Sequence, residues 1–243
     1  MKTVFLLVKF FNNPRYADGF VRGQVFARTL ADFKSDENSD ESGRVDPDEG
    51  TIAWYQPGKG RLTINGMDVT DDLAGPVKVQ KDWLNHLNVF CVHACHSGDL
   101  DLSSLSSDTI EDLRQELTID KRCFNLGNHA VVVRDVPEFV NRMESSARAK
   151  GYRIGRKLVR YYDPATFHGE FADIESVFRK QDQFSYQREF RFVIDRGTLE
   201  QEPLVMNVGD LSDITLQLKS TELNGEKLIG GKGRLVQEPV NRS

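Results

Sequence analysis

Residues 186–194 combine apolar and charged side chains in a pattern that could support catalysis. Aromatic and β-branched residues dominate the second half of this stretch, as is typical of a strand. Successive side chains of a strand point to opposite faces, so one face would carry Gln187, Glu189 and Arg191. An amide, a carboxylate and a guanidinium in a row fit a catalytic Gln-x-Glu pair that lines a cleft. They also fit the half-solvated face of an ordinary antiparallel strand.

Cations and a compact turn offer further candidate ligand contacts. Lys9 ends an apolar run, where it could anchor a phosphate or pyrophosphate or extend its ammonium group into solvent. Arg22 and Arg28 are alternative anchors of the same kind. The turn from Arg44 to Gly50 includes Asp46, Pro47 and Glu49, and it could hold polar groups against a ligand or be bonded within itself.

A cluster of cysteine and histidine residues is the natural metal candidate. Strand alternation would place Cys91, His93 and Cys95 on one face, with Cys123 or His129 to complete a site. Structural zinc sites favour turns over a flat strand, so we expect buried strand cysteines and no metal.

Several common catalytic motifs are missing from the sequence. There is no Gly-x-Ser-x-Gly elbow, no His-Glu-x-x-His helix and no dinucleotide-binding fingerprint. Residues 225–232 approach a phosphate-binding loop, but Glu226 stands where glycine is required and Gly233 replaces Ser or Thr. Without these motifs, the sequence does not fit the commonest classes of hydrolase, protease and dehydrogenase.

Strands outnumber helices among the elements that must position these residues. Apolar runs and alternation predict strands at 2–11, 24–30, 51–55, 61–65, 89–95, 130–133, 153–162, 186–194, 204–208 and 214–218. Caps and helical spacing predict helices from Pro14 to the residue before Gly23, at 109–117 with Ser107 or Asp108 as cap, and from Asp135 to Gly151. The acidic stretch 34–50 reads as a solvated loop, and 164–185 is ambiguous. We predict one α+β domain spanning residues 1–243.

Composition narrows the class of protein. The 243 residues are 39% hydrophobic and 28% charged, with a net charge of −5, so only a local basic patch could attract nucleic acid. No apolar run is long enough to cross a membrane. The N-terminal run is broken by Lys9 and lacks a small-residue cleavage site, which favours a core strand over a signal peptide. Three cysteines predict a reducing, cytoplasmic location.

Taken together, several short motifs resemble a known family, the ADP-ribosyltransferase toxins of bacterial toxin–antitoxin–chaperone anti-phage systems. The resemblance rests on Lys9-Phe10-Phe11, Tyr16-Ala17, Phe20, Gly23, Arg44-x-Asp46-Pro47-x-Glu49-Gly50, Gln187-x-Glu189-Phe190-Arg191 and Gly209-Asp210-Leu211-Ser212-Asp213-Ile214. It implies a strand-rich, split-sheet ADP-ribosyltransferase-like core. It further implies NAD as substrate, RNA as acceptor, and an antitoxin and a SecB-like chaperone as partners.

The resemblance also implies roles for particular residues. Glu189 would bond a hydroxyl of the nicotinamide ribose and stabilise the oxocarbenium-like charge as nicotinamide leaves, while Gln187 would position the acceptor. Lys9 takes the first-strand place where relatives carry Arg or His, and Thr29 stands nearest to a second-strand Ser/Thr motif. The remaining NAD contacts would be Arg44, Asp46, Glu49 and Arg191.

Two other functions remain open on sequence alone. One is a metal-independent nuclease or phosphodiesterase that uses His93 and His96 with basic residues. The other is a non-catalytic binding module in which the Gln187–Arg191 face is merely solvated.

Overall fold

The computed structural model describes residues 2–34, 43–103, 106–225 and 236–237. It shows the predicted α+β fold. Nearly all strand pairs are antiparallel. Part of the acidic stretch (35–42) and the loop compared above with a phosphate-binding loop (226–233) lie outside the described residues.

The largest sheet contains nine strands within the described residues, in the order β14-β2-β7-β1-β8-β15, with β13 and β9 following on the other edge of β7 and β16 pairing with β1. These strands are β1 (Thr3–Phe11), β2 (Gln24–Thr29), β7 (Asn88–His96), β8 (His129–Val133), β9 (Arg153–Leu158), β13 (Glu189–Asp195), β14 (Leu204–Asn207), β15 (Thr215–Lys219) and β16 (Val236–Gln237).

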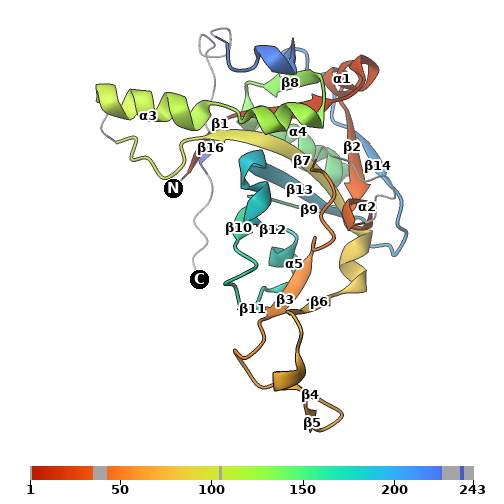
Figure 1. Cartoon of the computed structure of the whole chain (residues 1–243). Helices are drawn as coiled ribbons and strands as arrows, with labels where there is room; N and C mark the ends of the chain where they lie inside the picture. The colour runs from red at the N-terminus through yellow and green to blue at the C-terminus, as the bar shows by residue number, and fades with distance from the viewer. Residues whose placement is uncertain (1, 35–42, 104–105, 226–235, 238–243) are drawn as a thin grey trace.

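Shorter strands form three small sheets: β11-β3-β6, the parallel pair β10-β12, and the hairpin β4-β5. Their bounds are β3 (Thr51–Tyr55), β4 (Thr63–Ile64), β5 (Met67–Asp68), β6 (Val77–Gln80), β10 (Arg160–Tyr162), β11 (Gly169–Glu170) and β12 (Arg179–Gln181). Figure 1 shows these sheets below the main sheet, with the β4-β5 hairpin extending furthest from it.

Helices flank the main sheet. The α-helices are α1 (Pro14–Val21), α2 (Leu30–Lys34), α3 (Ser107–Leu117), α4 (Val136–Ala149) and α5 (Asp173–Ser176); the 3-10 helices are η1 (Thr70–Asp72), η2 (Asp82–His86), η3 (Lys121–Leu126), η4 (Asp182–Gln187) and η5 (Ser220–Glu222). The caps are largely those predicted. Asn13 and Asp135 accept hydrogen bonds from the first turns of α1 and α4, whereas α3 is capped by Ser106.

Opposite faces of the sheet carry different layers. α1 and α4 cover one face, where Phe20 and Phe139 pack on Phe90 and Phe192. The other face carries two separate apolar clusters, one under η3 and one under α2 and η2. Strand alternation places Glu189 and Arg191 on this second face.

The sheet forks along one edge of β7. β2 pairs with the start of β7 at Asn88 and Val89, and β1 pairs with its end from His93 onward. Among the described residues, 90–92 therefore have no strand partner on this edge, while their other edge pairs with β13. We call this opening between β1 and β2 the split.

Three predicted strands are shorter than expected. The strand predicted at 61–65 is reduced to β4 (Thr63–Ile64). The stretch 186–194 is a strand only from Glu189, because η4 ends at Gln187 and Arg188 adopts a left-handed backbone (φ 42°, ψ 50°). The chain also breaks at Val159, so 153–162 forms β9 and β10 in different sheets. The ambiguous segment before Arg188 contains β11, α5, β12 and η4.

Candidate active site in the split of the sheet

A cavity of about 640 Å³ lies across the split, which is a size common for small-molecule sites. It is lined by residues 8–12 of β1 and the following turn, 89–93 of β7, Phe26 and Arg28 of β2, Val205 of β14, Phe33, Arg44 and Leu126, residues of α1 (Arg15, Tyr16, Gly19, Phe20) with Gln24, and Lys180, Gln187 and Glu189. Because Lys9 and Glu189 come from opposite faces of the sheet, the split lets both reach one cavity.

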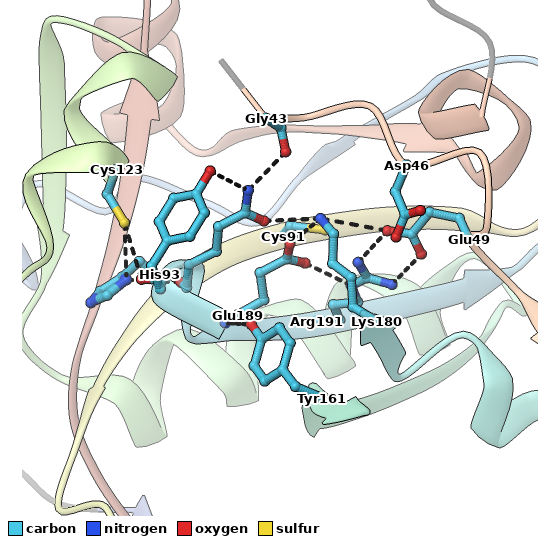
Figure 2. Close-up of polar contacts among 12 residues, drawn as sticks. Gly43, Asp46, Glu49, Cys91, His93, Cys123, Tyr161, Lys180, Glu189 and Arg191 are labelled. Carbon is cyan, nitrogen blue, oxygen red and sulfur yellow. Dashed lines mark hydrogen bonds and ion pairs between the residues drawn. The ribbon is translucent and has the colours of Figure 1, made fainter. Parts of the chain in front are cut away.

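Gln187 and Glu189 meet at a buried lysine. Lys180 Nζ donates to Gln187 Oε1 at 2.9 Å and to Glu189 Oε1 at 2.8 Å. The two side chains converge on this ammonium group although only Glu189 lies on β13. The predicted Gln-x-Glu pair therefore exists in space, with Lys180 between its members (Figure 2).

Arg191 and Glu49 lie behind this pair, away from the cavity lining. Arg191 Nε donates to Glu189 Oε2 at 2.7 Å, and its two terminal nitrogens bind the Glu49 carboxylate at 2.6 and 2.7 Å. Arg191 is only 1% exposed, and β13 is buried along nearly its whole length. The alternative of a half-solvated strand face is therefore wrong, because this face is covered by Val177, by Lys180 of β12 and by the turn around Glu49.

The buried charges control the ionisation of Glu189. Burial alone would raise the pKa of its carboxyl group, but attraction to Arg191 and Lys180, with their hydrogen bonds, outweighs burial and holds the pKa well below its usual range. Attraction to Glu189 and Glu49 in turn raises the pKa of Lys180 and of Arg191 against the opposing effect of burial. Glu189 is therefore an anion at the cavity wall, held by two cations.

Gln187 has a fixed amide orientation. While its oxygen faces Lys180, its Nε2 donates to the Gly43 carbonyl at 2.7 Å and lies 3.2 Å from the Tyr186 hydroxyl. These partners require the amide nitrogen on one side and the oxygen on the other. The side chain thus joins the end of η4 to the segment that enters the turn at Arg44.

Lys9 reaches the cavity from β1. Its Nζ donates to the Cys91 carbonyl at 2.7 Å and lies 4.7 Å from the centre of the Phe90 ring. Burial lowers the pKa of Lys9 to about 8. Arg28 and Arg44 also line the cavity, and Arg44 donates to the Leu126 carbonyl. Of the alternative anchors, Arg28 lies at the cavity and Arg22 does not.

Asp46 and Thr29 do not line the cavity. Thr29 is fully buried, and its hydroxyl accepts a hydrogen bond from the Asp32 amide, so it caps α2. Asp46 lies beside Glu49 (Figure 2); its Oδ1 accepts from the Asp48 amide, and its Oδ2 is buried without a hydrogen-bond partner. From Asp46 onward the turn is bonded within itself, as the second of the two interpretations made from sequence has it, whereas Arg44 at its start lines the cavity.

The histidines do not form a shared acid–base site. His93 lines the cavity and its Nδ1 lies 2.8 Å from the Gln187 carbonyl, so Nδ1 carries the proton; burial lowers its pKa to about 4. His96 lies outside the cavity lining and accepts at Nδ1 from the Gly98 amide. Burial lowers the pKa of His96 to about 3, so both rings are neutral near neutral pH.

The cysteine cluster gives no metal site in the part of the chain that the structure describes. Cys91, His93 and Cys95 share a strand, as predicted, but no three Cys, His, Asp or Glu side chains gather to hold an ion. All three cysteines are free, and burial raises the pKa of each thiol to about 12.

Sequence reasoning missed two residues at this site. Lys180 lies on β12 in the segment whose structure was ambiguous, and Tyr161 on β10 accepts a hydrogen bond from the Glu189 amide at 2.9 Å. The parallel pairing of β10 with β12 brings both beside β13. The sequence pattern does not reveal these two contacts. Lysine and tyrosine residues in short strands are common on protein surfaces, so neither residue type indicates a buried partner.

Comparisons with protein-family models, curated proteins and solved structures gave no match for the chain. None of the helices among the described residues is long and apolar enough to cross a membrane.

Proposed function

We propose that the protein is an NAD-dependent ADP-ribosyltransferase. The observation that carries the proposal is the charge pattern of the cavity in the split. Lys9, Arg28 and Arg44 line it together with Arg15, whereas Glu189, which Lys180 balances, is the carboxylate among its described lining residues. A cationic cavity in a chain with net charge −5 favours an anionic ligand such as one that carries a pyrophosphate.

Glu189 suits the step in which the glycosidic bond of NAD breaks. Nicotinamide leaves with the bonding electron pair, so positive charge develops on the ribose ring. The acceptor oxygen or nitrogen then forms a bond to the same ribose carbon, and its proton passes to solvent. A carboxylate that is already ionised stabilises this charge without first having to lose a proton, and Glu189 keeps free lone pairs for a ribose hydroxyl.

Apolar surfaces support the same ligand. Phe20 and Phe90 line the inner part of the cavity, whereas Tyr16, Phe26 and Val205 line it with side chains that are more than half exposed. Aromatic faces of this kind pack against flat rings such as adenine or nicotinamide. Lys9 and Arg28, from the two strands that border the split, would hold the phosphates between such rings.

The proposal extends to the biological setting. We propose RNA as the acceptor and the cytoplasm as the location, with an antitoxin and a SecB-like chaperone as partners. Co-purification from cells that carry the neighbouring genes tests the partners.

Incubation with NAD labelled on its adenosine half tests the activity. We expect label to transfer to RNA rather than to protein, and NAD to raise the melting temperature of the folded chain. Glu189→Gln should lower transfer by about 100-fold or more, while Glu200→Gln at an exposed loop position should leave it unchanged. Absence of transfer to either acceptor, or full activity of the folded Glu189→Gln variant, would show that the proposal is wrong.

A further inference from the structure

Four buried charged side chains form a closed ring at the wall of the cavity. Glu189 Oε1 binds Lys180, whose Nζ lies 3.6 Å from Glu49 Oε1; Glu49 binds Arg191, and Arg191 returns to Glu189 Oε2 at 2.7 Å. Two carboxylates and two cations balance one another within the ring. Figure 2 shows it extending from Glu189 to Glu49 through the two cations.

Lys180 is the member of this ring that also contacts Gln187. We propose that Lys180 is a positioning residue, which sets the spacing between the Gln187 amide and the Glu189 carboxylate, and that Glu49 acts through Lys180 and Arg191. This inference rests on the proposed transferase function, and it assigns Glu49 to the geometry of the site rather than to NAD contact.

The surroundings of Lys180 explain why a lysine can fix geometry here. A lysine side chain is usually mobile and well hydrated, but this one is only 3% exposed. Its ammonium group points at oxygens of Gln187, Glu189 and Glu49 and lies 4.5 Å from the centre of the Phe184 ring. An ammonium group has three N–H bonds, so three oxygen neighbours define its orientation.

Glu189 depends on both cations for its own orientation. Each carboxylate oxygen has a separate partner, Lys180 for Oε1 and Arg191 for Oε2. Without Lys180, the carboxylate would keep only the partner that lies behind the cavity wall. Rotation toward Arg191 would then move Oε1 away from Gln187 and from the developing charge.

A charge-balanced double variant tests this role with little risk to folding. Lys180→Met with Glu49→Gln removes one cation and one anion, and it leaves the Glu189–Arg191 pair. We expect this variant to keep the NAD affinity of the parent protein within about twofold, while kcat for transfer falls about 100-fold, since misplacement by about 1 Å can cost that much. The matched control is Lys81→Met with Asp173→Asn, an ion pair of 2.7 Å in a half-exposed position outside the cavity lining, which should change neither value.

Each alternative result has a distinct meaning. Unchanged kcat in the folded double variant would refute the positioning role, and a raised KM with unchanged kcat would make Lys180 a direct ligand contact. A crystal structure of the double variant gives a readout that needs no turnover: we expect Glu189 to shift relative to Gln187, and identical positions would overturn the inference. If the unaltered protein neither binds nor cleaves NAD, the proposed function fails while the structural comparison still decides whether Lys180 sets the spacing.

Discussion

Arg191 holds Glu49 through two parallel hydrogen bonds, from Nη2 to Oε1 at 2.6 Å and from Nη1 to Oε2 at 2.7 Å. This side-by-side geometry is the strongest arrangement between a guanidinium and a carboxylate. Both side chains are almost fully buried. Loss of one partner would therefore leave a charge without compensation in a poorly solvated place.

Arg191→Met should consequently destabilise the protein by about 3–5 kcal/mol, because Glu49 and Glu189 would then share one cation, Lys180. Urea denaturation monitored by circular dichroism measures this free energy. The control is Arg61→Met, which breaks the exposed Arg61–Asp68 pair and should cost less than about 1 kcal/mol. If the two variants lose the same free energy of unfolding, the buried ring of charges does not stabilise the protein more than an exposed ion pair does.

Lys9 should make ligand binding depend on pH. Burial lowers its pKa to about 8, and the nearby cations Arg44 and Arg28 act in the same direction. Lys9 is therefore charged below this pH and neutral above it, so affinity for an anionic ligand should fall as pH rises through about 8. Calorimetric titration with NAD across this range measures the effect.

An arginine at position 9 provides the matched control for this pH dependence. Arginine stays charged throughout the range, so Lys9→Arg should bind NAD with an affinity that is nearly constant through about pH 8. The explanation is wrong if the variant shows the same loss of affinity as the parent protein.

Arg28 and Arg22 differ in their relation to the cavity, and they form a natural pair of variants. Arg28 lines the cavity at the edge of the split, whereas Arg22 is exposed after α1 and does not line it. Arg28→Gln should weaken NAD binding about tenfold through the loss of a charge-assisted contact of about 1.5 kcal/mol. Arg22→Gln should have no effect, and a comparable loss in both would indicate only long-range attraction.

Asp46 should limit stability above its pKa. Burial, aided by repulsion from Glu49, raises this pKa from 3.8 to about 6. The native state therefore holds the proton more tightly than the unfolded chain, so the contribution of Asp46 to stability is present at low pH and is lost as pH rises through 6. At higher pH an ionised Asp46 destabilises the fold.

The variant Asp46→Asn tests the direction of this pH dependence of stability. It should stabilise the protein at about pH 8 by up to about 3 kcal/mol and have little effect near pH 4, because the parent side chain is then neutral in the native state. Urea denaturation at both pH values measures the difference, and Asp71→Asn at an exposed position is the control. A variant that is less stable at high pH would refute the prediction.

Local features of the fold were predictable from sequence, whereas the assembly of the site was not. The first strand and the caps Asn13 and Asp135 follow from apolar runs and short-range hydrogen bonding, and the structure confirms them. Arg188 takes a left-handed backbone that sequence rules assign to glycine or asparagine. Glu116 and His96 contact its side chain. Such partners lie far along the chain, so no local pattern reveals them.

Separation along the chain also limits how well the residues that line the cavity can be predicted. Residue type and resemblance identify Gln187, Glu189 and Lys9 as candidate site residues, and all three line the cavity. Thr29 and Asp46 had equally suitable types but face other partners, since strand and turn geometry decides which way a side chain points. Burial of neutralised charge, as at Lys180, contradicts the usual expectation that lysine is exposed.

Glu49 and Arg191 are 142 residues apart in the chain, which has a consequence for protein synthesis. At roughly 5–20 residues per second, a ribosome would add Arg191 roughly 7–28 s after Glu49. Until then Glu49 lacks the partner that neutralises it, and β13 is missing from the middle of the sheet. Under the proposed function, an incomplete chain that ends before Arg191 has no transferase activity, and the protein acquires this activity only late in its own translation.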